Sequence, residues 1–183
     1  RALTGSEVHR VLEACQDTQW HTIFHTLIWT GLRRSELLGL RWKDVDLLLA
    51  TLRVTQVLHQ LSDGSYVYTE PKTPKAKRSV VLSPASCLVL RSHRESQERD
   101  AALLGIELTD ETLVFCHVVD GAPLRPDTLG QAFRRKARQI GLPGVRLHDL
   151  RHTHASLMLQ QGVNPKTVAE RLGHASVTIT LDT

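Results

Sequence analysis

The segment LHDLRHT at residues 147–153 carries the most informative pattern in this chain. On a helix, His148 and Arg151 lie three positions apart, so their side chains emerge from one face. An imidazole beside a guanidinium suits a phosphate group, because the planar guanidinium binds two oxygens while the imidazole handles a proton. The segment therefore indicates a helix that presents a phosphate-binding face.

Basic and histidine side chains gather at other places along the chain. Arg33 follows Gly31, a glycine that can end a helix, and Glu36 lies three positions further on. An arginine held by its own carboxylate in this way would complete a clamp around a phosphodiester. The other gatherings are a lysine-rich turn with Lys72, Lys75, Lys77 and Arg78, and the later word Leu172-Gly173-His174.

Helix signals occupy both ends of the chain. Thr4-x-x-Glu7 fits a capping box, and apolar residues recur at helical spacing over Trp20–Trp29, with Gly31 as the stop. Further helices are predicted over Arg34–Leu40, from a cap at Ser83 to about Leu104, from a cap at Asp127 to about Ile140, and from Asn164-Pro165 to Gly173. Val177–Leu181 has strand-like propensity, and its state stays open.

The middle of the chain has a different pattern. Thr51–Leu58, Tyr66–Glu70 and Lys77–Leu82 are rich in β-branched or aromatic residues and are separated by turn signals. These segments predict one three-stranded antiparallel sheet, with the basic turn between its last two strands. The fold class is therefore mainly α (α+β), a helical bundle with a small sheet, in a single domain over residues 1–183.

The composition is that of a globular domain, with 183 residues, 41% hydrophobic and 23% charged. The net charge of +4 permits an anionic partner. Cys15, Cys87 and Cys116 form neither a disulfide framework nor a Cys-x-x-Cys pair, which fits a reducing cytoplasm. The apolar runs are shorter than the roughly 20 residues that a membrane span needs. We expect a cytoplasmic protein.

The order of these basic motifs along the sequence is also informative. Thr30-Gly31-Leu32-Arg33 with Glu36, then Lys72, His148-x-x-Arg151 and Leu172-Gly173-His174, resemble the signature boxes of the tyrosine recombinase (phage integrase) family. The resemblance runs over nearly the whole chain. It implies the catalytic-domain fold of a site-specific DNA recombinase, without the N-terminal core-binding domain and without the C-terminal tail.

The resemblance implies a role for each matching residue. Arg33 and Arg151 would hold the non-bridging oxygens of the scissile phosphate, and Glu36 would orient them. Lys72 would protonate the departing 5′ oxygen, and His148 would assist proton transfer from the nucleophile. His174 would hydrogen-bond the phosphate. Outside the matching residues, the basic side chains of Arg34, Lys75, Lys77 and Arg78 are candidates for contact with DNA. Family members need no metal and no cofactor.

The nucleophile that the family requires is not among these residues. In related integrases it is a tyrosine shortly after the histidine that matches His174, often following a word like Leu181-Asp182-Thr183. The resemblance thus places the tyrosine immediately after Thr183. Tyr66 and Tyr68 lie in the predicted sheet instead. The chain is expected to bind DNA without cleaving it.

The implied partner is double-stranded DNA at attachment sites, in a bacterial or phage setting at the nucleoid. Family members act as tetramers on DNA, whereas this chain alone is expected to be a monomer without membrane contact.

Other interpretations stay open beside the family reading. One is a decayed, inactive integrase-like DNA-binding protein or regulator. Another is a metal-dependent nuclease, because His21/His25 and His148/His152 have the spacing of zinc ligands. A type IB topoisomerase uses the same chemistry but is disfavoured by the small size and the integrase-like words. We expect His152 and His154 to be structural.

Overall fold

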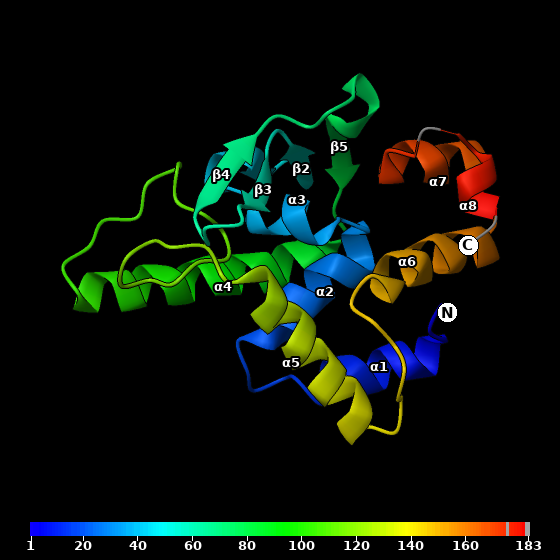
Figure 1. Cartoon of the computed structure of the whole chain (residues 1–183), viewed down its shortest axis with the longest axis horizontal. Coiled ribbons are helices and arrows are strands. Elements are labelled where there is room, and N and C mark those ends of the chain that lie inside the picture. Colours follow the sequence, from blue (N-terminus) through cyan, green and yellow to red (C-terminus); the bar gives the residue numbers. More distant parts are fainter. Residues whose placement is uncertain (175, 182–183) are drawn as a thin grey trace.

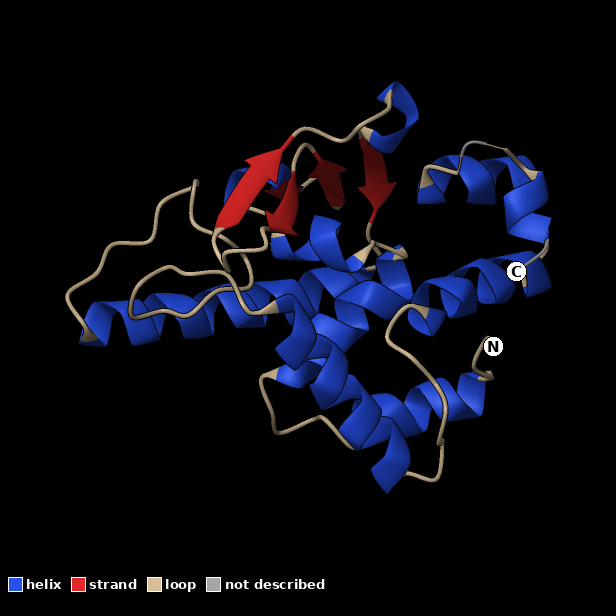
Figure 2. Cartoon of the chain, in the orientation of Figure 1, coloured by secondary structure: helices blue, strands red, loops and turns tan. Residues whose placement is uncertain are grey.

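A computed structural model describes residues 1–174 and 176–181 of the chain (Figure 1). The helices are α1 (Gly5–Glu13), α2 (Trp20–Thr30), α3 (Arg34–Leu38), α4 (Pro84–Leu103), α5 (Pro126–Gln139), α6 (Asp149–Gln160), α7 (Pro165–Leu172) and α8 (Thr178–Leu181). The strands are β1 (Val45–Asp46), β2 (Thr51–Val54), β3 (Val57–Gln60), β4 (Tyr66–Thr69) and β5 (Arg78–Val81), and short 3-10 turns cover Trp42–Asp44 and Pro74–Ala76. The strands lie together on one side of the helices (Figure 2).

Helix α2 forms the centre of the helical body and packs against α1, α4 and α6. Its sequence is apolar around most of its circumference, as expected for a helix that is surrounded by others. Phe24 of α2 is fully buried and meets Phe133 of α5 edge to face, with 5.2 Å between the ring centroids. This core holds the end of α2, where the site begins, in a fixed position.

The predicted strand Thr51–Leu58 is wrong as a single element, because the chain leaves one sheet and enters another at residues 55–56. Gln56 donates its side-chain amide to the carbonyl of Gly39 at 2.8 Å. Gly39 also permits close approach, since a Cβ there would lie 3.2 Å from the backbone of Val57. This contact between the end of α3 and the start of β3 breaks the strand in two.

The pairing of the strands also differs from the prediction. One sheet has the order β1-β2-β5, and β3 pairs with β4 in a separate hairpin. Residue Thr51 of β2 lies opposite Val81 of β5, and Val57 of β3 opposite Thr69 of β4. The basic segment at residues 71–77 therefore connects two sheets and does not form a hairpin turn within one.

The helix boundaries follow the local signals closely. Both hydrogen bonds of the Thr4–Glu7 capping box are present, and Gly31 and Gly173 end α2 and α7 in the left-handed conformation. Arg125, rather than Asp127, is the N-cap of α5. The C-terminal segment whose state the sequence left open forms α8. None of the described helices is long and apolar enough to cross a membrane.

Gly31 makes a testable contribution to this fold. Its φ is +66°, and a Cβ would overlap Leu172 Cδ2 and lie 2.7 Å from Cδ2 of His154. We expect Gly31→Ala to lower the free energy of unfolding by about 2–3 kcal/mol, through backbone strain and overpacking together. Gly162→Ala is the matched control, because Gly162 has φ +78° but open space around its Cβ position. Equal losses in urea denaturation would contradict the steric argument.

Candidate phosphate-binding site

Arg33 stands between the end of α2 and the start of α3. Its backbone N–H donates to Glu36 Oε2 at 2.8 Å, and its Nη1 donates to Glu36 Oε1 at 2.8 Å. Its Nη2 lies 3.4 Å from the carbonyl oxygen of Gly173, which it also donates to. The side chain keeps 39% of its surface exposed. The guanidinium is thus fixed in direction yet open to a ligand.

Glu36 lies beneath this arginine and is almost completely buried, with 2% of its side chain exposed. Arg78 of β5 donates to both of its carboxylate oxygens, at 3.0 and 2.9 Å. Burial alone would raise the pKa of Glu36, but the hydrogen bonds and charge of Arg78, helped by Arg33, lower it to about 2. Glu36 is therefore ionised at neutral pH, and its carboxylate holds two guanidinium groups.

Arg151 projects from the first turn of α6 into the same region and is buried. Its Nη1 donates to the carbonyl of Gly31 at 2.7 Å, and its Nη2 donates to the carbonyl of Leu172 at 2.5 Å. Burial, and then the positive charge of Arg33, lower the pKa of Arg151 to about 9. It remains a cation at neutral pH, and its repulsion from Arg33 would be relieved by an anion.

The last turn of α7 gathers these arginines, and we call residues 171–173 the α7 carbonyl turn. The carbonyls of Arg171, Leu172 and Gly173 accept from Arg78 Nε, Arg151 Nη2 and Arg33 Nη2, respectively. Carbonyl groups at the C-terminus of a helix carry partial negative charge, so they stabilise nearby cations. These contacts hold three positive side chains in one place.

Two of the predicted histidines border the arginines. His148 is the N-cap of α6, and its ring meets that of His152 edge to face at 5.0 Å. Burial, followed by the charges of His152 and Arg151, lowers the pKa of His148. His174 shares a 2.8 Å hydrogen bond between its Nδ1 and Thr180 Oγ1, and burial with the charge of Arg151 lowers its pKa to about 4. Both rings are neutral at pH 7.

The lysines of the connecting segment are placed differently from one another. Lys72 is exposed and has no hydrogen bond or ion pair with the described residues. Lys77 forms an exposed ion pair with Glu70 at 2.7 Å. The backbone carbonyl of Lys75 lies near Gly173, where it would be 3.0 Å from a Cβ. The segment thus lies against the site through Lys75, while Lys72 stays in solvent.

The other predicted DNA-binding residues also separate into two groups. Arg78 was a DNA-binding candidate in the lysine-rich turn, but its side chain is 6% exposed and bonded to Glu36. Arg34 is exposed at the start of α3 and donates from Nη1 to the carbonyl of Pro126 at 3.1 Å. Arg78 therefore contacts Glu36 on the buried side of the site, and Arg34 lies at its exposed edge.

Sequence reasoning missed Arg171 and Thr180. Arg171 Nε donates to His154 Nε2 at 3.0 Å, and its Nη2 donates to the carbonyls of Trp29 and Val81. It thereby joins α7 to α2 and β5. Arg171 lies next to the Leu172-Gly173-His174 word, the one signal that could have drawn attention to it. Thr180 lay in the strand-like segment Val177–Leu181, whose state the sequence left open.

His154 is a buried structural residue, as expected. Its Nδ1 pairs with the carbonyl of Ile28 at 2.9 Å, and Arg171 donates to its Nε2. Burial, and then the charge of Arg171, lower the pKa of His154 to about 3. The folded protein therefore keeps this ring neutral.

This pKa predicts a loss of stability in mild acid. Because the unfolded chain protonates His154 near pH 6.5 and the folded chain near pH 3, its contribution is complete above pH 6.5 and declines as the pH falls. Wild type should lose about 1.4 kcal/mol more than His154→Gln between pH 7.5 and 5.5 in urea denaturation. Equal losses in the two proteins would contradict the buried neutral histidine.

The described residues offer no metal site built from three or more His, Cys, Asp or Glu side chains. The rings of His21 and His25 are neighbours, with centroids 5.9 Å apart. Within the described residues, no third potential metal ligand joins this pair. Trp42 is fully buried and donates from Nε1 to Gln97 Oε1, so its ring is not open to a ligand.

Comparisons with known proteins identify relatives of this chain. The chain is 36% identical over 168 residues to the ICEBs1 integrase of Bacillus subtilis (strain 168), a match that covers 91% of this chain and 45% of that protein. It is 31% identical over 187 residues to a XerC-like tyrosine recombinase of Caldanaerobacter subterraneus, covering 97% and 48%. The chain thus spans about half the length of the curated relatives that it matches.

Solved structures give the same fold. The integrase of transposon Tn1549, in complex with transposon right end DNA, matches with a TM-score of 0.85 at 24% identity, over 100% of this chain and 60% of that chain. The XerA recombinase matches with a TM-score of 0.76 at 26% identity, over 99% and 57%. The predicted mainly helical fold with a small sheet is confirmed. Since the phage integrase family model also matches residues 1–182, the chain belongs to the phage integrase family.

Proposed function

We propose that residues 1–183 form the single catalytic domain of a site-specific tyrosine recombinase, which cleaves and rejoins DNA strands through a 3′-phosphotyrosyl intermediate. The observation that carries this proposal is the convergence of Arg33 and Arg151 on the α7 carbonyl turn, with His148 and His174 beside them. The relatives named above are integrases and recombinases, and the Tn1549 integrase was solved with DNA.

The arginines supply electrostatic stabilisation in this proposal. A guanidinium has five N–H donors, and the contacts of Arg33 and Arg151 described above leave some of them for a phosphate. Negative charge grows on the non-bridging oxygens as the pentavalent transition state forms. Donors already oriented towards those oxygens stabilise this charge without reorganisation. Glu36 and Arg78 act as positioning residues, because they orient Arg33 from the buried side.

The remaining residues handle protons. A tyrosine hydroxyl attacks the phosphorus and gives its proton to neutral His148, while the bond from phosphorus to the 5′ oxygen breaks. Lys72, on the connecting segment, protonates the departing oxygen. His174 hydrogen-bonds the phosphate from the side opposite Thr180. The phosphodiester energy is kept in the phosphotyrosyl bond, so rejoining the strand consumes no high-energy cofactor.

The same proposal includes the cellular location of the protein, its DNA partner and its oligomeric state. The protein acts on attachment sites in double-stranded DNA, at the bacterial nucleoid in the cytoplasm. Four copies assemble on paired sites, and exposed basic side chains such as Lys75 and Lys77 contact the DNA backbone.

Covalent trapping tests the proposed function. The protein, in the length that its gene encodes, is incubated with nicked duplexes tiled across the DNA that flanks the gene. We expect a slowly migrating protein–DNA adduct on a denaturing gel, equally strong with and without a chelator. Salt-dependent DNA binding without an adduct on any duplex would overturn the enzymatic proposal in favour of a DNA-binding regulator. Loss of the adduct with chelator would point to metal-dependent chemistry.

A further inference from the structure

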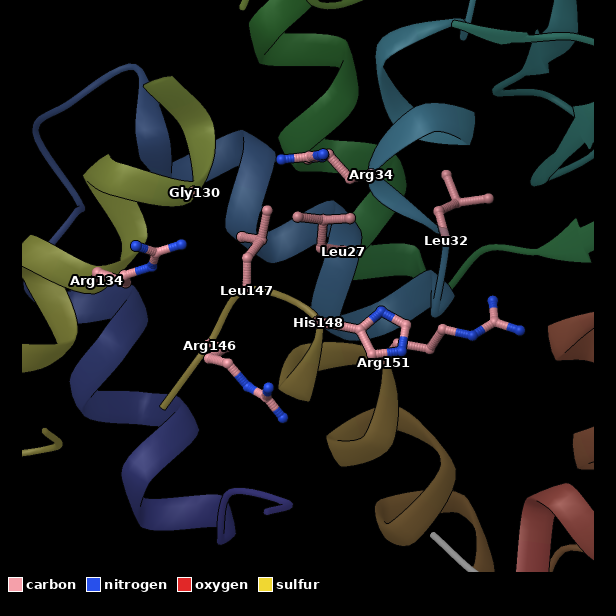
Figure 3. Close-up of a pocket in the computed structure, with 9 residues that line it drawn as sticks. All are labelled: Leu27, Leu32, Arg34, Gly130, Arg134, Arg146, Leu147, His148 and Arg151. Carbon is pink, nitrogen blue, oxygen red and sulfur yellow. The ribbon is translucent and has the colours of Figure 1, made fainter. Parts of the chain in front are cut away.

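A cavity of about 270 Å³ opens beside the phosphate-binding site, between α3, α5 and the segment that leads into α6 (Figure 3). It shares His148 and Arg151 with that site. The rest of its lining takes no part in the chemistry assigned above, although Arg34 is one of the DNA-binding candidates named from the sequence. These residues are Leu27, Leu32, Arg34, Gly130, Arg134, Arg146 and Leu147. The described lining residues are rich in arginine and include no carboxylate.

Two of these arginines face one another across the cavity in Figure 3. Arg34 reaches in from α3 and is held by one hydrogen bond to the carbonyl of Pro126, which leaves most of its donors unused. Arg134 reaches in from α5 and is exposed, without a hydrogen bond or ion pair to any described residue. The carboxylate of Asp127 lies 3.7 Å from Arg34 Nη1, but it is 83% exposed and therefore screened by water. This positive charge is therefore poorly compensated.

Gly130 leaves room between the two arginines. It lies one helical turn before Arg134 on α5 and is buried, yet a Cβ built on it would meet nothing within 4 Å. A glycine in the middle of a helix is unfavourable for the helix itself. Here it keeps open a space that a side chain would narrow, and the space is contiguous with Arg151.

We propose that Arg34 and Arg134 together hold one further DNA phosphate, adjoining the scissile phosphate that Arg33 and Arg151 hold. The inference rests on the proposed function, because it needs a DNA strand at the first site. Planar guanidinium groups suit the paired oxygens of a phosphate, and a phosphate contact fixes the register of a duplex on a protein. The cavity thus sets which phosphate enters the cleavage site.

The salt dependence of DNA binding tests this proposal, because each phosphate contact contributes about −0.9 to the slope of log K against log salt. Binding of residues 1–183 to a fluorescent duplex is measured by anisotropy at several salt concentrations. We expect Arg34→Ala/Arg134→Ala to reduce the magnitude of the slope by about 0.9, the value for one shared phosphate. Gly130→Leu should give the same reduction, because leucine fills the cavity without changing the net charge.

The control removes two exposed arginines from α4, in the double variant Arg91→Ala/Arg99→Ala, and should leave the slope unchanged. Thermal unfolding verifies that each variant is folded. An unchanged slope in both cavity variants would overturn the second phosphate site alone. A reduction near 1.8 in the double arginine variant would mean separate phosphates and would also overturn it. A wild-type slope near zero would overturn DNA binding by the chain, and with it the proposed function.

Discussion

Replacing Glu36 with alanine is expected to lower the free energy of unfolding by about 3–5 kcal/mol, the usual cost of removing one partner from a buried ion pair. Arg78 is also buried, and it would lose both of its bonds to a carboxylate. Arg33 would lose its side-chain and backbone bonds to the same group. Two cations would then repel each other in a poorly solvated space, and urea denaturation should record the loss.

Glu7 provides the matched control for this variant. It occupies the same capping-box position in α1 that Glu36 has in α3, and its pKa is also lowered to about 2. Its partner Arg1 is exposed, however, so Glu7→Ala should cost only about 1 kcal/mol. Equal costs for the two variants would show that burial of the Glu36 pair has no special weight.

A double variant distinguishes the loss of the buried ion pair from the loss of side-chain volume. Glu36→Gln/Arg78→Met removes the buried charge on both sides, so it should be more stable than Glu36→Ala.

The pH dependence of the free energy of unfolding also has a definite sign. Because the pKa of Glu36 is lowered from 4.5 to about 2 by folding, its contribution is complete above pH 4.5 and is lost as the pH falls towards 2. The double variant should lack this decline.

The second large effect is on the chemistry. Arg33→Gln in the gene-length protein should slow formation of the covalent adduct by about 10²–10³-fold, the usual effect of removing one preorganised donor from a transition state. The fold should survive, because Arg33 is partly exposed and Glu36 keeps its pair with Arg78. Single-turnover adduct formation on nicked DNA measures the rate, with DNA in excess so that weaker binding does not contribute.

Arg99→Gln is the control for this measurement, since Arg99 is exposed and lies near the C-terminal end of α4. It should react at the wild-type rate. If Arg33→Gln reacted within a few-fold of wild type, the role of Arg33 in the transition state would be refuted. Binding that is lost along with activity, and restored together with it at low salt, would assign Arg33 to ground-state contact only.

Local signals predicted the helices well, and tertiary contacts explain where the prediction of the strands failed. Thr4, Asn164, Gly31 and Gly173 act through hydrogen bonds and dihedral angles within a few residues, so their effects can be read from the sequence. The break after β2 depends on Gln56 meeting Gly39, a contact that no nearby residue announces. Strand partners were misassigned for the same reason.

The residues of the candidate site also divide into those that the sequence could predict and those that it could not. The arginine and histidine words indicated phosphate chemistry because of their residue types and spacing, and the structure brings Arg33, Arg151 and His174 together. The burial of Arg78 could not be foreseen, since an exposed and a buried arginine look alike in a lysine-rich segment. Arg134 and Gly130 lay on a helix with no distinguishing pattern, and only the packing of α5 beside α3 gives them a common cavity.

The α7 carbonyl turn has a consequence for protein synthesis. It binds arginines that are distant in the chain, from Arg33, which is 140 residues away from Gly173, to Arg151, which is 21 residues away from Leu172. A ribosome adds about 5–20 residues per second, so an unfinished chain exposes its basic side chains for several seconds before α7 emerges. During that interval the guanidinium groups have no common scaffold, so the three arginines come together only after α7 has been made.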